Sequence, residues 1–166
     1  MKNRKALLFG LFILLTSCSN NKNKAVVAYS EKGGITLVSL EEYKTLFMSE
    51  ENIVSLITLK DENFCSTCAG GSITDISQYA YEQHFTIYKL EFDINEEENF
   101  ITDYTSLVEF MSEKNDNGLD PLSFNEDGIA TIPVMPRLIL SNSGYIGFNV
   151  STNFVAKLKE TIVVKN

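Results

Sequence analysis

The sequence predicts an α/β fold, in which strands and helices alternate along the chain. Apolar, β-branched runs typical of buried strands alternate along the chain with stretches in which apolar residues recur every three or four positions. The chain has 166 residues, of which 44% are hydrophobic and 22% are charged. This length and composition suit one folded domain of ordinary size.

Residues 1–17 have the pattern of a cleavable export signal. A basic start (MKNRK) precedes the apolar run 6–15, which is too short to span a bilayer. Leu15-Thr16-Ser17-Cys18 resembles the lipobox of bacterial lipoproteins, in which the cysteine sulfur receives a diacylglycerol and becomes the new first residue. The resemblance implies lipidation of Cys18, a flexible tether over 18–24, and a domain over 25–166 on the extracytoplasmic face of the cell membrane. A non-lipidated secretory signal and an uncleaved anchor are the alternatives.

Two short β-branched segments open the predicted domain. The segments 25–30 (AVVAYS) and 35–40 (ITLVSL) flank the turn-rich sequence 31–34 (EKGG), so we predict an N-terminal hairpin. Ser39 then begins a capping-box pattern, which predicts a helix that runs through Phe47.

The next predicted strand leads into a Cys-x-x-Cys motif. Residues 53–59 (IVSLITL) have the pattern of a buried strand, and Cys65-Ser66-Thr67-Cys68 follows a short polar loop. The segment 72–84 has apolar residues at helical spacing, with Ser72 placed to cap its start. The motif therefore lies between a strand and a helix N-terminus, where the helix dipole and free backbone N–H groups stabilise a thiolate.

The cysteine count favours a reactive pair over a structural one. If Cys18 is acylated, Cys65 and Cys68 are the two cysteines that remain. A disulfide between them closes so small a loop that it adds little stability by restricting the unfolded chain. A zinc ribbon would need a second cysteine pair, and His84 is the one histidine of the chain. His84 suits a capping or surface position at the end of a helix, so no metal site is predicted.

The remaining elements continue the alternation of strands and helices. In chain order we predict a strand over 85–94, a helix from the acidic stretch 95–99 to about Glu113, a loop over 114–128 with room for a helical turn near Pro121, strands at 138–140 and 145–150, and a last helix that Ser151 caps and that includes Ile162. Two prolines precede the strand at 138–140, and Pro136 is closer to it than Pro133.

This order of elements resembles the thioredoxin fold, which implies a central mixed β-sheet flanked by helices. Met135-Pro136-Arg137-Leu138-Ile139-Leu140, with the turn Asn142-Ser143-Gly144 after it, resembles the cis-proline segment of that family. The resemblance covers about residues 39–165. It implies that the N-terminal hairpin is an extension of the fold and that residues 95–130 contain an insertion before the cis-proline strand. It implies that Pro136 is in cis and that Met135 offers its backbone to a substrate, with Pro133 as the competing proline.

The resemblance also implies a thiol–disulfide oxidoreductase. Cys65 would attack a disulfide, and Cys68 would resolve the mixed disulfide. No cofactor is needed, but the implied partners are thiols and disulfides of exported proteins and a membrane or extracytoplasmic redox protein. Leu59 occupies about the position at which thioredoxins bury a proton-relaying acid. In this chain Asp61, Glu62 or water would relay the proton when Cys68 resolves the mixed disulfide.

The charge balance excludes one class of partner. The chain has 22 acids and 14 bases, and loss of residues 1–17 removes three bases and no acid, which leaves a net charge near −11. Such a chain does not bind nucleic acid, because that affinity comes from basic residues that neutralise phosphates.

Two other functions stay open at this point. One is a copper-binding metal chaperone that uses both thiolates and His84, because Cu(I) favours soft thiolate ligands. The other is a non-catalytic accessory lipoprotein of the same fold.

Overall fold

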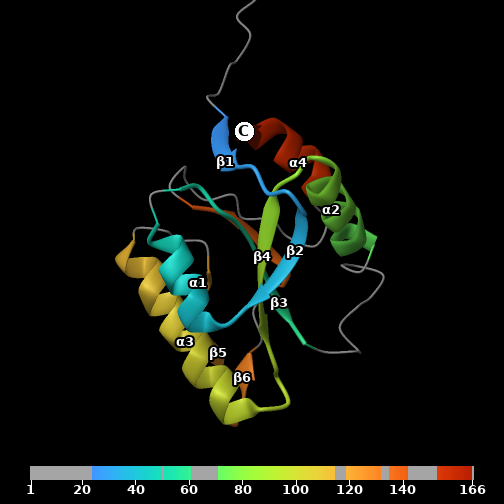
Figure 1. Cartoon of the computed structure of the whole chain (residues 1–166). Coiled ribbons are helices and arrows are strands. Elements are labelled where there is room, and N and C mark those ends of the chain that lie inside the picture. Colours follow the sequence, from blue (N-terminus) through green and yellow to red (C-terminus); the bar gives the residue numbers. More distant parts are fainter. Residues whose placement is uncertain are drawn as a thin grey trace, which may run out of the picture.

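The computed structural model describes residues 24–49, 51–60, 71–114, 119–131, 135–141 and 153–165. Their elements in chain order are β1 (Ala25–Ala28), β2 (Gly34–Val38), α1 (Leu40–Phe47), β3 (Val54–Leu59), α2 (Gly71–Glu82), β4 (Thr86–Phe92), α3 (Glu97–Glu113), β5 (Ser123–Phe124), β6 (Ala130–Thr131), β7 (Arg137–Leu140), α4 (Phe154–Thr161) and β8 (Ile162–Lys165). Figure 1 shows the sheet between two pairs of helices.

A mixed sheet of order β2-β4-β3-β7 forms the centre of the fold. β2, β4 and β3 are parallel to one another, and β7 is antiparallel to β3. All six residues of β3 are buried, as expected for a central strand with helices over both of its faces. The predicted α/β class, with a mixed sheet flanked by helices, is confirmed.

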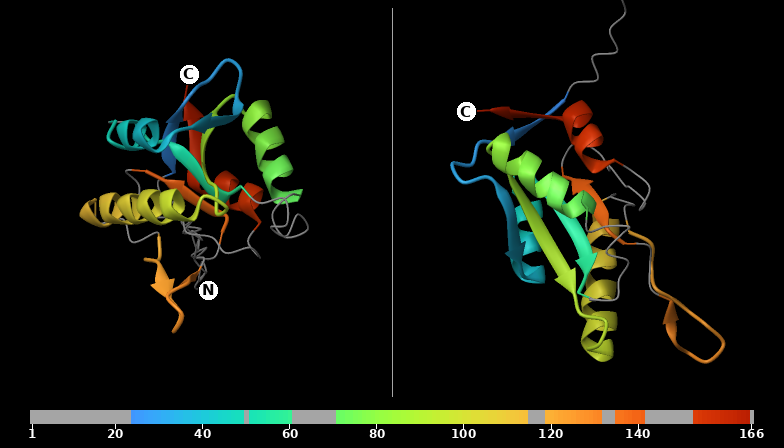
Figure 2. Two further views of the ribbon diagram at one scale, coloured as in Figure 1. Left: turned by 90° about the horizontal axis from the view of Figure 1, so that it is seen from below. Right: turned by 90° about the vertical axis from the view of Figure 1, so that its right-hand side faces the viewer.

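Helices α2 and α4 cover one face of the sheet, and α1 and α3 cover the other (Figures 1 and 2). Successive residues of a strand point to opposite faces, so adjacent β3 residues belong to different cores. Leu56 packs with Ile76 and Leu158 on the α2–α4 side. Ile57 packs with Tyr104 and Met135 on the α1–α3 side. The helices are therefore fixed to the sheet by two separate hydrophobic clusters.

Helix α1 begins as its sequence predicts. The Ser39 hydroxyl accepts a hydrogen bond from the Glu42 backbone N–H, and a Glu42 carboxylate oxygen accepts one from the Ser39 N–H at 2.8 Å. The hydrogen bonds from the Ser39 backbone and hydroxyl hold the pKa of Glu42 below its ordinary value. This reciprocal capping satisfies two backbone donors at the helix start.

The predicted N-terminal hairpin is wrong. β1 pairs in parallel with β8, and β2 pairs in parallel with β4. The connection between β1 and β2 is held against the end of α2, where the Ser30 N–H donates to the His84 carbonyl at 2.7 Å. A Cβ on Gly33 would lie 2.7 Å from the Ala80 carbonyl oxygen, and Gly33 has a φ of +59°. This close approach carries the chain past α2 to β4, so β2 does not fold back on β1.

The predicted loop after α3 contains a small hairpin. β5 and β6 are antiparallel, and the Asn125 side-chain oxygen accepts hydrogen bonds from the backbone N–H groups of Asp127 and Ile129. Within 119–131, the described residues around Pro121, there is no helical turn, contrary to that prediction. Figure 2 shows this hairpin extending away from the helices and the sheet. It occupies part of the segment that we predicted as an insertion.

The last helix begins and ends at other residues than predicted. Its N-cap is Asn153, whose side-chain oxygen accepts from the Ala156 N–H, whereas Ser151 lies outside the described residues. Ile162 begins strand β8 and is not part of the helix. The helix after the cysteine motif likewise begins at Gly71, ahead of the predicted cap Ser72. The strand predicted at 145–150 lies outside the described residues.

Candidate functional site

The predicted site centres on the edge of the sheet where β3 ends. Cys65 and Cys68 lie within 61–70, outside the described residues, and the lipidation residue Cys18 also lies outside them. The elements on either side of that segment are described, because β3 ends at Leu59 and α2 begins at Gly71. The segment with both cysteines therefore connects a central strand to a helix N-terminus, as the sequence predicted.

Met135 and Pro136 lie beside the same edge. The peptide bond between them is cis, as the resemblance implied. Arg137 is opposite Ile57 in the antiparallel register of β3 and β7, so the continued register places Pro136 opposite Thr58. The Met135 side chain is 1% exposed and packs in the α1–α3 core. The structure thus brings these two residues next to the strand end that leads into the cysteine segment, while Pro133 lies outside the described residues.

Three cations near this edge are each paired with a carboxylate. The ion pairs are Lys60–Asp93 at 3.2 Å, Arg137–Asp120 at 2.8 Å, and Lys89–Glu91. Pairing offsets most of the positive charge that these side chains would otherwise offer to a nearby anion. The first turn of α2, in contrast, contains no acidic residue that would offset the positive end of its dipole.

Thr58 is a buried polar residue at this edge that was not singled out from the sequence. Its side chain is 5% exposed, and its hydroxyl has no hydrogen-bond partner among the residues that the structure describes. It lies two residues after Leu56 on β3 and so faces the α2 side of the sheet. An unpaired buried hydroxyl costs about 1–3 kcal/mol. The one signal in the sequence was a threonine near the end of a mostly apolar strand.

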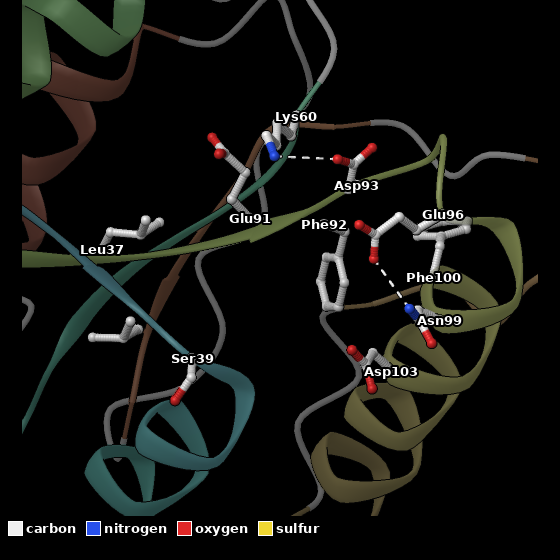
Figure 3. A pocket seen from close by; sticks show the side chains of 11 residues that line it. Leu37, Ser39, Lys60, Glu91, Phe92, Asp93, Glu96, Asn99, Phe100 and Asp103 are labelled. Carbon is white, nitrogen blue, oxygen red and sulfur yellow. Dashed lines mark hydrogen bonds and ion pairs between the residues drawn. The ribbon is translucent and has the colours of Figure 1, made fainter.

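A pocket of about 570 Å³ lies at the strand ends on the α1–α3 side of the sheet (Figure 3). It is bounded by the carboxyl ends of β2 and β4, by the α1 N-cap Ser39 and by the first two turns of α3. The carboxyl ends of strands are where α/β sheets commonly bind ligands. Its walls combine apolar and acidic side chains, and the acidic ones are Glu91, Asp93, Glu96 and Asp103. The sequence analysis missed this pocket, although polar residues recur every three or four positions from Glu96 to Asp103.

Asp93 is held in its ionised form within this pocket. The Asn95 backbone N–H donates to one carboxylate oxygen at 3.0 Å, and the Lys60 ammonium lies 3.2 Å from the other. The Asn95 hydrogen bond, followed by the Lys60 interaction, lowers the pKa of Asp93 below its ordinary value of 3.8. Lys60 also donates its backbone N–H to the Phe92 carbonyl at 2.7 Å. These contacts join the end of β3 to the end of β4.

Asp93→Asn is expected to destabilise the protein at neutral pH and to have a smaller effect in acid. Because the folded-state pKa is lowered, the ionised carboxylate stabilises the folded protein above about pH 4, and this contribution is lost as the pH falls through the folded-state value. Urea unfolding of both proteins at neutral pH and at about pH 3 measures the difference. A difference in stability that is the same at both pH values would contradict this role.

The structure does not bring His84 to the edge where β3 ends. His84 follows the C-terminal end of α2, where its ring stacks on Tyr29 at 5.3 Å and its Nδ1 lies 3.3 Å from the Glu31 carbonyl oxygen. The 12 residues of α2, about 18 Å of helix, separate it from the point where the cysteine segment joins. Within the described ranges, no group of three His, Cys, Asp or Glu side chains could hold a metal ion.

No family model, curated protein or solved structure matches this chain. Among the described helices, none is long and apolar enough to cross a membrane. Inference about function therefore depends on the motif, the elements around it and the charges at the sheet edge.

Proposed function

We propose that this protein is a membrane-tethered, extracytoplasmic thiol–disulfide oxidoreductase of thioredoxin-like fold that acts through Cys65 and Cys68. One observation carries the proposal: the Cys-x-x-Cys segment connects the end of β3, which lies next to Met135 and Pro136, to the start of α2. A reactive cysteine pair needs a helix N-terminus that stabilises its thiolate and a neighbouring backbone against which a substrate can lie. Both are present at this edge.

The described fold is compatible with that family. Its elements follow the order strand, cysteine motif, helix, strand, helix, proline and strand that underlies the resemblance. The cis peptide bond at Pro136 occurs where the resemblance places it. Helices lie on both faces of the sheet, so the strand ends are left as the accessible edge.

The distribution of acidic residues over the helix starts favours a thiolate before α2. The first turns of α1 and α3 each contain two acidic residues, Glu41 and Glu42 in α1 and Glu97 and Glu98 in α3. The first turn of α2 contains none. A cysteine thiolate at the start of α2 would therefore meet the positive end of the dipole without repulsion from a carboxylate in that turn.

The proposed reaction is a pair of thiol–disulfide exchanges. The Cys65 thiolate attacks one sulfur of a client disulfide, the client S–S bond breaks, and the released client thiolate takes up a proton. The Cys68 thiolate then attacks the Cys65 sulfur, which breaks the mixed disulfide and releases the second client thiolate. The client gains two electrons and the Cys65–Cys68 pair is oxidised. A redox partner that supplies dithiol equivalents restores the pair, and the reverse sequence oxidises a client dithiol.

The proposed location outside the cytoplasm depends on the N-terminal pattern. Cys18 would carry the lipid, and the tether 18–24 would separate it from the domain. β1 begins at Ala25, which is the first residue of the domain predicted from the sequence. Cleavage and lipidation together would leave the domain joined to the membrane by a short polar segment.

Rates of alkylation test the proposal. In the reduced full chain in detergent, Cys65 of the Cys68→Ser variant should react with iodoacetamide with a thiol pKa below about 8.5, whereas Cys68 of the Cys65→Ser variant should react slowly. Mass spectrometry assigns the modified residue, and Cys18 should stay unmodified because its sulfur carries the lipid. Equal rates for Cys65 and Cys68, with the ordinary pKa of a free cysteine, would count against the proposal.

A further inference from the structure

The pocket beside the strand ends combines an apolar surface with open volume. Phe92 at the end of β4 and Phe100 on α3 line one wall, with their ring centroids 6.1 Å apart and each residue only 4% exposed, and Leu37 of β2 lies across from them (Figure 3). Leu37 is 64% exposed although it is apolar. A volume of about 570 Å³ is ample for a long side chain and a short length of backbone.

The charges of the pocket are mostly negative. Lys60 is the one cation among the residues that line it, and its ammonium is paired with Asp93. Glu96 accepts a hydrogen bond from the neutral Asn99 side chain at 3.0 Å, and neither Glu96 nor Asp103 has an ion pair within the described part of the chain. Figure 3 shows both carboxylates on the α3 side of the pocket. The pocket therefore presents two carboxylates without an ion pair in the described part of the chain, together with the exposed apolar side chain of Leu37.

This combination matches the side chain of lysine or arginine. Such a side chain has an apolar stem, which can lie along the exposed Leu37, and a cationic head, which can reach Glu96 and Asp103. A bare metal ion fits less well, because in the described residues no three acidic, histidine or cysteine side chains converge to ligate one.

The pocket is also within reach of the proposed reaction. Lys60 lines the pocket, and Cys65 follows it by five residues, so their Cα atoms are at most about 18 Å apart. We propose that the pocket binds a lysine or arginine side chain of the client protein close to the client's disulfide. This inference depends on the proposed function, and it gives that function a substrate class: exported proteins with a basic residue near a disulfide.

Peptide binding to a protein that cannot exchange disulfides tests the pocket separately from the chemistry. The full chain with Cys65→Ser and Cys68→Ser, in non-ionic detergent, is titrated with a labelled disulfide peptide that has one lysine, and with the same peptide carrying glutamine instead. The pocket variant adds Glu96→Gln and Asp103→Asn. The matched control adds Glu113→Gln and Asp127→Asn, which remove the same charge at exposed positions outside the pocket.

We expect the protein without the two cysteines to bind the lysine peptide more tightly than the glutamine peptide. The pocket variant should bind the lysine peptide about fivefold more weakly than that protein does, and the control variant should bind it with the same affinity. Equal weakening in the pocket variant and the control would overturn the inference, because binding would then follow net charge alone. Equal affinity for the two peptides would overturn the inference as well. So would a calcium titration in which the protein binds calcium, the pocket variant does not, and neither protein prefers the lysine peptide. The alkylation rates decide the proposed function independently, so failure of one proposal is distinguishable from failure of the other.

Discussion

Replacing Cys68 with serine is expected to leave the protein covalently joined to its clients. With Cys65 present, the first exchange still forms a mixed disulfide, but no second thiol is available to attack the Cys65 sulfur. Turnover should fall to the rate of the uncatalysed exchange, and the trapped adduct should persist until a reductant is added. Non-reducing electrophoresis followed by mass spectrometry of the adduct measures both the yield and the residue that forms the bond.

The matched control for this trap is Cys65→Ser. This variant retains one cysteine in the motif, at the resolving position, and should form little or no adduct. Similar amounts of adduct from both variants would contradict the assignment of Cys65 as the attacking residue, because the two thiols would then be equivalent.

Tyr104→Ala is expected to cause the largest loss of stability among single changes in α3. The Tyr104 side chain is fully buried, and its ring centroid lies 5.6 Å from that of Phe92 and 5.7 Å from that of Phe100. Its hydroxyl donates to the Asp120 carbonyl at 2.9 Å, which fixes the segment after α3. Truncation of a buried aromatic residue costs about 3–5 kcal/mol, a large part of the stability of a typical domain. Urea unfolding at neutral pH measures the loss.

Tyr104→Phe separates the ring from the hydroxyl. This change keeps the aromatic packing and removes the hydrogen bond to Asp120, so it should cost about 1 kcal/mol. The Asp120 side chain also forms an ion pair with Arg137, which directly follows Pro136. Loss of the hydrogen bond from Tyr104 to Asp120 should therefore destabilise the start of β7 as well. A Tyr104→Ala protein that is less than about 1 kcal/mol destabilised would show that this cluster does not hold α3 on the sheet.

Elements whose signals are local could be predicted from the sequence. The capping box at Ser39 needs only residues three positions apart, and the structure has it. β3 has a mostly apolar, β-branched sequence, and all six of its residues are buried because helices cover both faces of the sheet. On α3 the buried residues recur every three or four positions, at Phe100, Tyr104, Leu107 and Met111, as the helical spacing of apolar residues in the sequence indicates. In each case a short stretch of chain contains the information that decides its conformation.

Elements that depend on distant partners could not be predicted. β1 and β2 look like a hairpin locally, yet β1 pairs with β8 at the other end of the chain and β2 pairs with β4. Ile162 continues the apolar spacing of α4, although it begins a strand that needs β1 as its partner. The register that places Pro136 by the end of β3 likewise follows from pairing across the sheet.

In the candidate site, too, the residues with local sequence signals could be predicted and those brought together by tertiary packing could not. Cys65, Cys68 and Pro136 were identified from short motifs, and the proposed chemistry follows from their residue types. The pocket was missed because its residues come from separate elements, and on the sequence Glu96 and Asp103 look like the solvated face of a helix. Only the packing of α3 against the ends of β2 and β4 brings these carboxylates next to apolar side chains.

The reduction potential of the Cys65–Cys68 pair tests the central claim most directly. The full chain is equilibrated with glutathione or dithiothreitol buffers, and the fraction of oxidised pair is measured after acid quenching and alkylation. We predict a reversible two-electron couple with a potential between about −270 and −120 mV, the range of thiol–disulfide oxidoreductases. A pair that shows no reversible couple in either buffer would contradict the proposed function.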